Sequence, residues 1–393
     1  MAEYFPLDTL EDRRLATPQL KRLTHFFSLI TIIGLIAGSY ASMVGHRYAY
    51  GVYREIPWGL LTSSFAFFAM TATGLCLLSA IGHAYGVLTL APLGTRAVYL
   101  SVVMTISGFL LFGFSIENPW RLFLYNATSP NLTANIWWMC TLFGVMSGCL
   151  FLKFSFLVAN RFGWAIGIGT LGAVAGVGAN NNLGGLFATA ADPPIWYDFQ
   201  MLILFLTSAV LTGAAAIIIA TDFAFRIRKQ KIGGDMLKAM QAAGTILALT
   251  LAILLVVTVS RYTSMFFGDT TEPGQVAALA LIKGPLAFNF WIMECLAGLV
   301  LPLLILIITK VKNIGAMKIA GYLALAGAFF QRYDLVISGQ IVPKLIDFND
   351  ITPYLHYAPT VVELLEVMGA FGLLGAGFLL GERFIGKVFR IYP

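Results

Sequence analysis

Seven ionisable residues lie within or next to long apolar stretches of the sequence: Glu117, Asp198, Glu294, Arg332, Asp334, Glu363 and Glu366. A charged side chain inside a bilayer costs about 2.5–3.5 kcal/mol on insertion scales, so each of these residues requires a partner or a function. Acidic and basic groups that gather in one part of a membrane bundle can relay protons. We interpret five of them as a candidate proton path: Asp198, Glu294, Arg332, Asp334 and Glu363.

The histidines and cysteines predict no bound redox cofactor or metal. A b-type haem needs axial ligands at membrane depth, usually two histidines on facing helices. All four histidines fall at the ends of apolar stretches: His25, His46, His83 and His356. The four cysteines form no CxxC pair and no Cys/His cluster: Cys76, Cys140, Cys149 and Cys295. The sequence therefore predicts no haem, no iron–sulfur cluster, no zinc site and no disulfide framework.

The composition excludes a protein that stays in water. The chain of 393 residues is 59% hydrophobic and 11% charged, whereas a soluble domain carries about 25% charged residues. Its mean hydropathy is +0.83. A soluble enzyme, a disordered protein and a nucleic-acid binder are excluded, although the net charge is +6.

Ten stretches are apolar enough to cross a bilayer as helices, which takes about 20 residues each. They are 26–45, 58–82, 97–116, 136–158, 164–189, 197–221, 241–263, 286–309, 315–338 and 359–381. In the fifth stretch, the asparagines 180–182 and Gly184 and Gly185 predict a helix broken near one end. The three predicted segments are 1–25, the membrane domain 26–381 and the tail 382–393, and both end segments are predicted to be cytoplasmic.

The distribution of Lys and Arg predicts the orientation, because basic loops stay cytoplasmic. With the N-terminus inside, 18 of the 25 basic residues fall on the inner side. The seven on the outer side are Arg47, Arg54, Arg121, Arg261, Lys283, Arg332 and Lys344. The sequence thus predicts an all-α, polytopic bundle of ten transmembrane helices with both termini cytoplasmic. The candidate proton path then opens toward the outer face.

Aromatic residues also gather on the predicted outer face: Tyr48, Tyr50, Tyr53, Trp58, Trp120, Tyr125, Trp137, Trp138, Trp196 and Tyr197. An interfacial belt of Trp and Tyr is typical of membrane proteins. Flat rings can equally form the wall of a pocket for a quinone headgroup. Both interpretations stay open at this point.

Local strings along the chain resemble the NrfD / polysulfide reductase membrane-subunit family. They are Arg54-Glu-Ile-Pro-Trp-Gly59, Glu117-Asn-Pro-Trp-Arg-Leu-Phe123, Ser129-Pro130 with Trp137-Trp138, Asn182-Leu-Gly-Gly-Leu186 with Pro194-Ile-Trp196, Phe290-Trp-Ile-Met-Glu294, and Pro359-Thr-Val-Val-Glu-Leu-Leu365. The ten-helix members that the chain resembles are the hydrogenase-2 membrane subunit, the quinone subunit of alternative complex III and the membrane subunit of the Dsr complex. This resemblance covers the second to the tenth stretch.

The resemblance implies a membrane anchor that exchanges electrons between a ferredoxin-like iron–sulfur subunit and the quinone pool. It implies that the quinone is menaquinone or ubiquinone, that the chain carries no redox cofactor of its own, and that the complex includes a further catalytic or cytochrome subunit. The implied location is the inner membrane of a prokaryotic cell, as a multi-pass protein in contact with lipid. The resemblance implies that the chain alone is not a catalyst.

Carried over by position, the resemblance implies six quinone-binding residues: Trp58, Thr62, Phe65, Glu117, Arg121 and Asn182. Thr62 and Phe65 stand where the polysulfide reductase type has a polar residue and a histidine, and Asn182 stands where it has a tyrosine. The missing histidine leaves open a purely structural anchor without a quinone site. A secondary transporter is the other alternative, because ten helices, a broken helix and intramembrane charges are also typical of that class.

Overall fold

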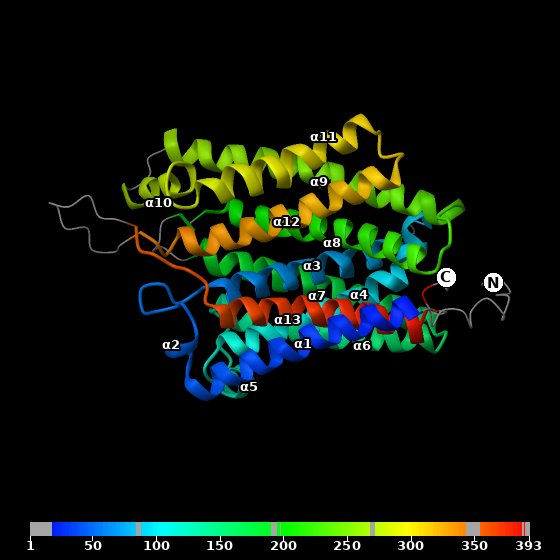
Figure 1. Ribbon diagram of the computed structural model, residues 1–393, viewed down its shortest axis with the longest axis horizontal. Coiled ribbons are helices and arrows are strands. Elements are labelled where there is room, and N and C mark those ends of the chain that lie inside the picture. The colour runs from blue at the N-terminus through cyan, green and yellow to red at the C-terminus, as the bar shows by residue number, and fades with distance from the viewer. Residues whose placement is uncertain are drawn as a thin grey trace.

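The computed structural model describes residues 18–83, 88–189, 195–196, 198–267, 272–342, 354–386 and 389. Within these ranges the chain is helical and contains no strand (Figure 1). Ten of the helices are long and apolar enough to cross a membrane. The predicted all-α bundle with ten transmembrane helices is confirmed. Residues 1–17 of the predicted segment 1–25 and half of the predicted segment 382–393 lie outside the described residues, as do Pro194, Tyr197 and Lys344.

The ten spans are α1 (Pro18–Val44), α3 (Leu60–His83), α4 (Ala91–Ser115), α6 (Asn135–Val158), α7 (Phe162–Ala188), α8 (Gln200–Ile227), α9 (Gly234–Phe267), η3 (Asn289–Val300) continued by α11 (Leu301–Ile308), α12 (Ile314–Ser338) and α13 (Val361–Phe384). Four short helices connect them: α2 (His46–Ala49), η2 (Leu88–Leu90), α5 (Pro119–Thr128) and α10 (Glu272–Ile282).

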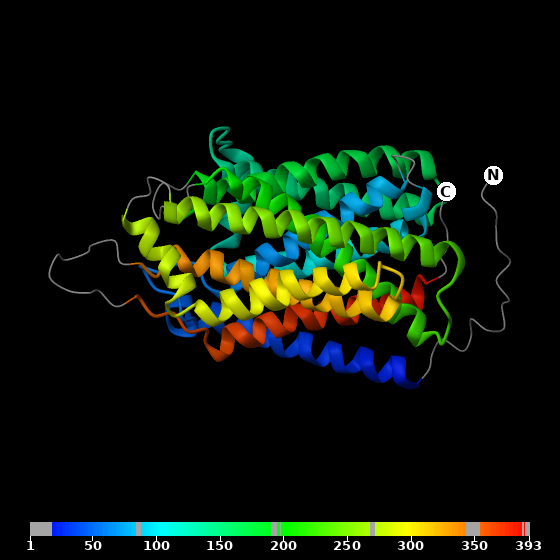
Figure 2. The ribbon, with the colours of Figure 1, turned by 90° about the horizontal axis from the view of Figure 1, so that it is seen from above.

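The long helices run side by side along the long axis of the molecule (Figures 1 and 2). We call the end where α1 begins and α13 ends the proximal end. The opposite end, which carries α2, α5 and α10, is the distal end (Figure 1). The distal end corresponds to the predicted outer face.

Helix α3 lies at the centre of the bundle. It packs against α4, α7, α8, α12 and α13. In the 18-residue apolar segment of α3, 89% of the residues are buried, whereas in that of α1 only 22% are. Glycines bring helix axes close together at Gly74 of α3 with Gly213 of α8, and at Gly34 of α1 with Gly369 of α13. A Cβ atom added at these positions would collide with the backbone of the neighbouring helix, so these contacts require glycine.

Helix α7 is continuous, and the predicted break in it is wrong. The helix runs through Asn180, Asn182 and Gly185 without interruption. The Asn182 side chain donates from Nδ2 to the carbonyl oxygen of Gly178 at 2.8 Å, so it bonds within its own helix. Asn135 of α6 donates to the Gly185 carbonyl oxygen at 3.0 Å. The polar and glycine-rich end thus packs against other helices and does not unwind.

The irregular span is the eighth one, where η3 is a π-helix. Hydrogen bonds from residue i to i+5 widen such a helix, and π-helical turns occur frequently at functional sites. Here the widened turns bring two polar side chains to α12. Asn289 donates to Asp334 at 3.1 Å, and Glu294 accepts from Gln331 at 3.1 Å.

We expect a membrane-impermeant thiol reagent applied from outside the cell to label Asn131→Cys but not Lys231→Cys. Asn131 is exposed at the distal end, and Lys231 is exposed in the proximal loop after α8. The four native cysteines are buried or half-buried, so they give little background. The reagent reaches Lys231→Cys only after the membrane is permeabilised. Labelling of Lys231→Cys in intact cells would contradict the cytoplasmic placement of the proximal end.

Candidate functional site

A cluster of buried polar side chains lies between α3, α8, α9, η3 and α12. At its centre, the Arg332 side chain is fully buried. Its guanidinium carbon lies 4.1 Å from the centre of the Phe205 ring, and its Nε atom lies 3.0 Å from the Met70 sulfur. Both terminal nitrogens lack a hydrogen-bond partner among the described residues. A buried guanidinium without a paired acid is costly, which marks this cluster as a functional candidate.

Hydrogen bonds link the two buried carboxyls of this cluster to α12 and η3. Glu294 accepts from the Gln331 amide, and Gln331 in turn accepts from the Ser208 hydroxyl at 3.2 Å. Asp334 accepts from Asn289 through Oδ1, while its Oδ2 atom has no partner among the described residues. The structure therefore brings together Glu294, Arg332 and Asp334 of the predicted proton path.

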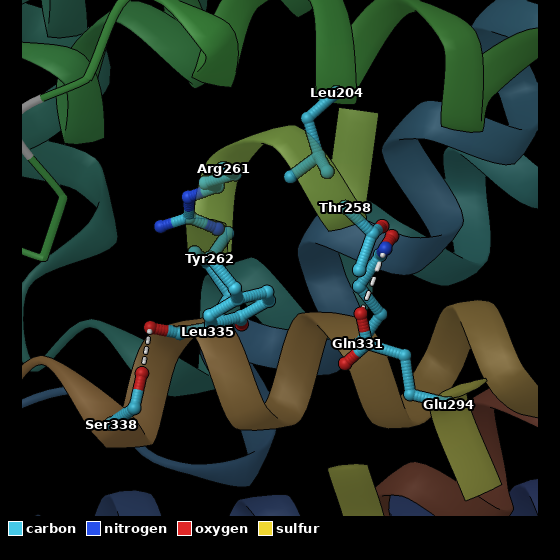
Figure 3. A pocket seen from close by; sticks show the side chains of 8 residues that line it. All are labelled: Leu204, Thr258, Arg261, Tyr262, Glu294, Gln331, Leu335 and Ser338. Atoms are coloured by element: carbon cyan, nitrogen blue, oxygen red, sulfur yellow. Dashed lines mark hydrogen bonds between the residues drawn. The ribbon is translucent and has the colours of Figure 1, made fainter. Parts of the chain in front are cut away.

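A small, largely enclosed cavity adjoins Glu294 (Figure 3). Its volume is about 10 Å³, the space of one water molecule. The lining residues are Leu204, Thr258, Arg261, Tyr262, Glu294, Gln331, Leu335 and Ser338. Figure 3 shows Arg261 at one end of this cavity, and Glu294 with Gln331 at the other.

Arg261 connects this cavity to the distal surface. Its NH2 group donates to the Ile195 carbonyl oxygen at 2.7 Å, and its Nε atom lies 3.5 Å from Oδ2 of Asp198. The Arg261 side chain is 4% exposed and the Asp198 side chain 19%. The ion pair thus has one partner inside the bundle and one near the surface. The sequence predicted Arg261 only as an outer basic residue and gave no sign that its side chain lies inside the bundle.

Asp198 also lines a groove of about 580 Å³ at the distal end of α6, α7 and α8. The groove is lined by Asn135, Asn181, Asn182, Gly185, Ala188, Thr189, Asp198, Phe199 and Leu202. Phe199 is 73% exposed, so the groove reaches the surface of the bundle. The structure thus joins Asn182, predicted to bind quinone, with Asp198, predicted to carry protons.

The other predicted quinone-binding residues do not line this groove. Trp58 stacks on Trp196 with 5.4 Å between ring centres, and Gln340 holds the Trp58 backbone through two hydrogen bonds. Phe65 stacks on Phe112 of α4 at 4.5 Å. Thr62 is half-buried on α3. The aromatic residues pack against one another.

Glu117 and Arg121 lie at the distal surface, just before and within α5, and both are exposed. In the described part of the chain they form no ion pair. Glu117 is close enough to His46 to influence its titration: burial lowers the pKa of His46, and the Glu117 charge partly offsets this shift. The six predicted quinone-binding residues therefore do not share one pocket in the described part of the chain.

Glu363, the fifth residue of the predicted proton path, caps α13. Its carboxylate accepts hydrogen bonds from the backbone N–H groups of Gly51 and Thr360 and from the Tyr357 hydroxyl. With the Thr360 side chain it forms a capping box, which stabilises the first turn of α13. Burial and the Glu363 charge raise the pKa of Tyr357, so this hydroxyl stays a donor. A role of Glu363 in proton transfer stays a prediction.

Two buried basic sites at the proximal end were not predicted from the sequence. Glu382 pairs with Arg96 at 2.9 Å and with Arg228 at 2.6 Å, and all three side chains are at most 5% exposed. Lys153 of α6 donates to the Ser79 hydroxyl at 2.6 Å and is also buried. The sequence contains one signal for the first site. Glu382 is an acidic residue at the inner end of the last apolar stretch, where most charged residues are basic.

Comparison with known proteins decides the family. The model of the family described as Polysulphide reductase, NrfD matches residues 49–344. This chain belongs to the NrfD polysulphide reductase family. The matched range includes the groove, the enclosed cavity and Arg332, and it ends before α13.

Two relatives match most of the chain. It is 21% identical to the Hdr-like menaquinol oxidoreductase integral membrane subunit of Archaeoglobus fulgidus over 393 aligned positions, which cover 94% of both chains. It is 23% identical to a selenate reductase subunit of Mesobacillus selenatarsenatis over 365 positions, which cover 82% of this chain and 83% of the relative. This NrfD chain is thus a multi-pass integral membrane protein that aligns with both relatives over most of its length.

Proposed function

We propose that this NrfD-family chain is the membrane subunit through which an oxidoreductase complex exchanges electrons with the quinone pool. The family match over residues 49–344 is the observation that carries this proposal. The names of the two relatives, a menaquinol oxidoreductase membrane subunit and a selenate reductase subunit, place such chains in multi-subunit oxidoreductases. The chain alone is not a catalyst.

The finer parts of the proposal concern the partners and the location. Both relatives are named as subunits of oxidoreductases, so the electrons are exchanged with another subunit. We propose that this partner is an iron–sulfur protein, with a further catalytic or cytochrome subunit behind it. We also propose the inner membrane of a prokaryote as the location. The first relative's name favours menaquinone over ubiquinone.

We place the quinone headgroup in the distal groove. Its volume of about 580 Å³ falls in the range of small-molecule sites. A quinone needs donors for its two carbonyl oxygens and an apolar exit for its tail. Asn181 and Asn182 supply amide N–H groups, and the exposed Phe199 with Leu202 supplies an apolar side. The residues Trp58, Thr62, Phe65, Glu117 and Arg121 lie outside the groove. We treat the region near α3 and α5 as a second location for the headgroup, which mutagenesis can compare with the groove.

The structure weakens one argument for a secondary transporter. That alternative used a broken helix at residues 180–185, and α7 is continuous there. The π-helix in the eighth span favours neither alternative, because π-helical turns occur at functional sites of many kinds. The other alternative is a structural anchor without a quinone site. A complex with such an anchor would show no quinone-dependent activity, whereas one with a quinone-reactive subunit would.

We expect purification of the tagged chain in mild detergent to recover a partner with an iron–sulfur signal. The complex should transfer electrons both to a soluble dye and to a quinone analogue in liposomes. The chain separated from its partners should show neither a haem spectrum nor an iron–sulfur signal. A complex with dye activity but no quinone activity would support the structural anchor, and a stoichiometric haem in the separated chain would refute the cofactor assignment.

A further inference from the structure

We propose that Glu294 is a proton store that exchanges with the distal groove through Asp198, and that Arg261 is the positioning residue that links them. This inference rests on the proposed function, because the quinone in the groove is the partner in proton exchange. It differs from a path across the membrane: the store has one opening, at the distal end.

The Arg261 side chain spans the distance between the groove and the cavity. Its partner Asp198 lines the groove, and Arg261 itself lines the cavity beside Glu294. The Asp198 contact is long, at 3.5 Å, and uses only Oδ2. Oδ1 of Asp198 accepts from the backbone N–H of Gln200 at 2.8 Å, which fixes this carboxylate at the start of α8.

The cavity has room and partners for a bridging water molecule. The Thr258 hydroxyl is buried and has no hydrogen-bond partner among the described residues. Thr258 and Glu294 both line the cavity. A buried water needs two to four polar partners, and the Thr258 hydroxyl and the Glu294 carboxyl meet that requirement. A proton can pass between two groups that share one water.

The charges around the cavity leave one carboxyl without a counter-charge. The groups that face Glu294 are Arg261 and Tyr262 from α9, Arg332 and Asp334 from α12, and Cys295 from its own helix. With Asp198 added, three carboxyls share two guanidinium groups. An unbalanced charge in a buried site is costly, so the cluster is electrically neutral when one carboxyl holds a proton. That proton is the exchangeable one.

Behind Glu294 the route ends in apolar side chains. A second cavity of about 10 Å³ also touches Glu294 and Gln331, but the rest of its lining is apolar: Leu211, Leu254, Gly298, Leu299, Ala324, Gly327 and Ala328. Apart from Glu294 and Gln331, this lining offers a water molecule no polar partner that would continue the route. The next buried carboxylate toward the proximal end of α8, Asp222, pairs with Arg226 and Lys318 instead. The store is therefore filled and emptied from the groove.

The partner subunit gives two electrons to a quinone, and the quinone takes up two protons to become a quinol. One of them is the proton of Glu294: its O–H bond breaks, the proton leaves by way of the cavity water, and the Asp198 carboxylate beyond Arg261 receives it and passes it to the quinone. The second proton comes from water at the surface that the groove reaches, and Arg261 compensates the carboxylate left on Glu294 until the groove supplies a new proton. Oxidation of a quinol runs the same steps in reverse.

The test follows hydrogen–deuterium exchange at Glu294 by infrared spectroscopy of the reconstituted complex. The carbonyl band of the protonated carboxyl is identified as the band that Glu294→Gln removes. We expect Asp198→Asn and Arg261→Gln to slow exchange at this band about tenfold or more, and Arg261→Lys to restore part of the rate. Asp222→Asn, the matched control at the proximal end, should leave the rate unchanged. Dye reduction reports that each variant assembles.

Three results would overturn the proposal: no such band in the unmodified protein, an unchanged exchange rate in Asp198→Asn, or slowing by Asp222→Asn instead. The last result would indicate a route from the proximal end. Failure of the proposed function gives a different pattern, because a chain without quinone activity would still show the band and its exchange through Asp198.

Discussion

Replacing Asn182 with leucine is expected to lower the affinity of the complex for quinone about 5- to 150-fold, while dye reduction at the soluble subunit is unchanged. The structure places the Asn182 amide in the distal groove, where one N–H bonds to Gly178 and the other is free to reach a ligand. Loss of a hydrogen bond in a buried site costs about 1–3 kcal/mol, which corresponds to this range of affinity. The measurement is quinone reduction or quinol oxidation in liposomes over a range of quinone concentrations.

Two sets of variants make this result specific. Asn126→Leu is the matched control, because Asn126 bonds to Thr141 and lies outside the groove. Thr62→Val, Glu117→Gln and Arg121→Ala test the second location. Normal quinone kinetics in Asn182→Leu together with weaker binding in Glu117→Gln and Arg121→Ala would move the headgroup from the groove to the region near α5.

Replacing Glu382 with glutamine is expected to destabilise the protein by about 3–5 kcal/mol, the cost of breaking a buried ion pair. Glu382 of α13 is the shared acid between Arg96 of α4 and Arg228 after α8. Without its charge, two buried guanidinium groups lose the carboxylate that they share. We expect a large loss of monodisperse protein after detergent extraction and a lower unfolding temperature by fluorescence-detected size exclusion.

Asp235→Asn is the control for this result. Asp235 also pairs with a basic residue, Lys238, but both side chains are largely exposed, at 70% and 69%, and exposed pairs contribute little. A Glu382→Gln variant as stable as Asp235→Asn would show that the two arginines find other partners, and that the triad does not hold α13 to the bundle.

The sequence predicted the spans well because hydropathy and length alone select membrane helices. It predicted that the candidate proton path opens toward the outer face, and three of its residues, Glu294, Arg332 and Asp334, lie in one buried cluster. It did not show which helix faces which. Asn182 and Asp198 were therefore assigned to separate functions although they line one groove. Arg261 was counted only as an outer basic residue, since distance along the chain does not show that a side chain turns inward.

Two local errors have a physical cause as well. Polar and small residues at 180–185 predicted a broken helix, but other helices cover that end of α7 and remove the cost of exposing it to lipid. The π-helix at Asn289–Val300 left no signal in an apolar stretch, because its extra width depends on packing against α12. Interhelical contacts decide both cases, and a single sequence does not contain them.

The central position of α3 has a consequence for biogenesis. This helix is the second span to leave the ribosome, yet two of its neighbours, α12 and α13, are the last. Until they are synthesised, the surface of α3 that they cover in the complete bundle is open to lipid. Thr71 and Thr73 donate to the backbone carbonyls of Phe67 and Ala69, at 2.8 and 3.0 Å, within the same helix. A newly inserted α3 thus already satisfies these hydroxyls and can wait in the bilayer for the rest of the chain.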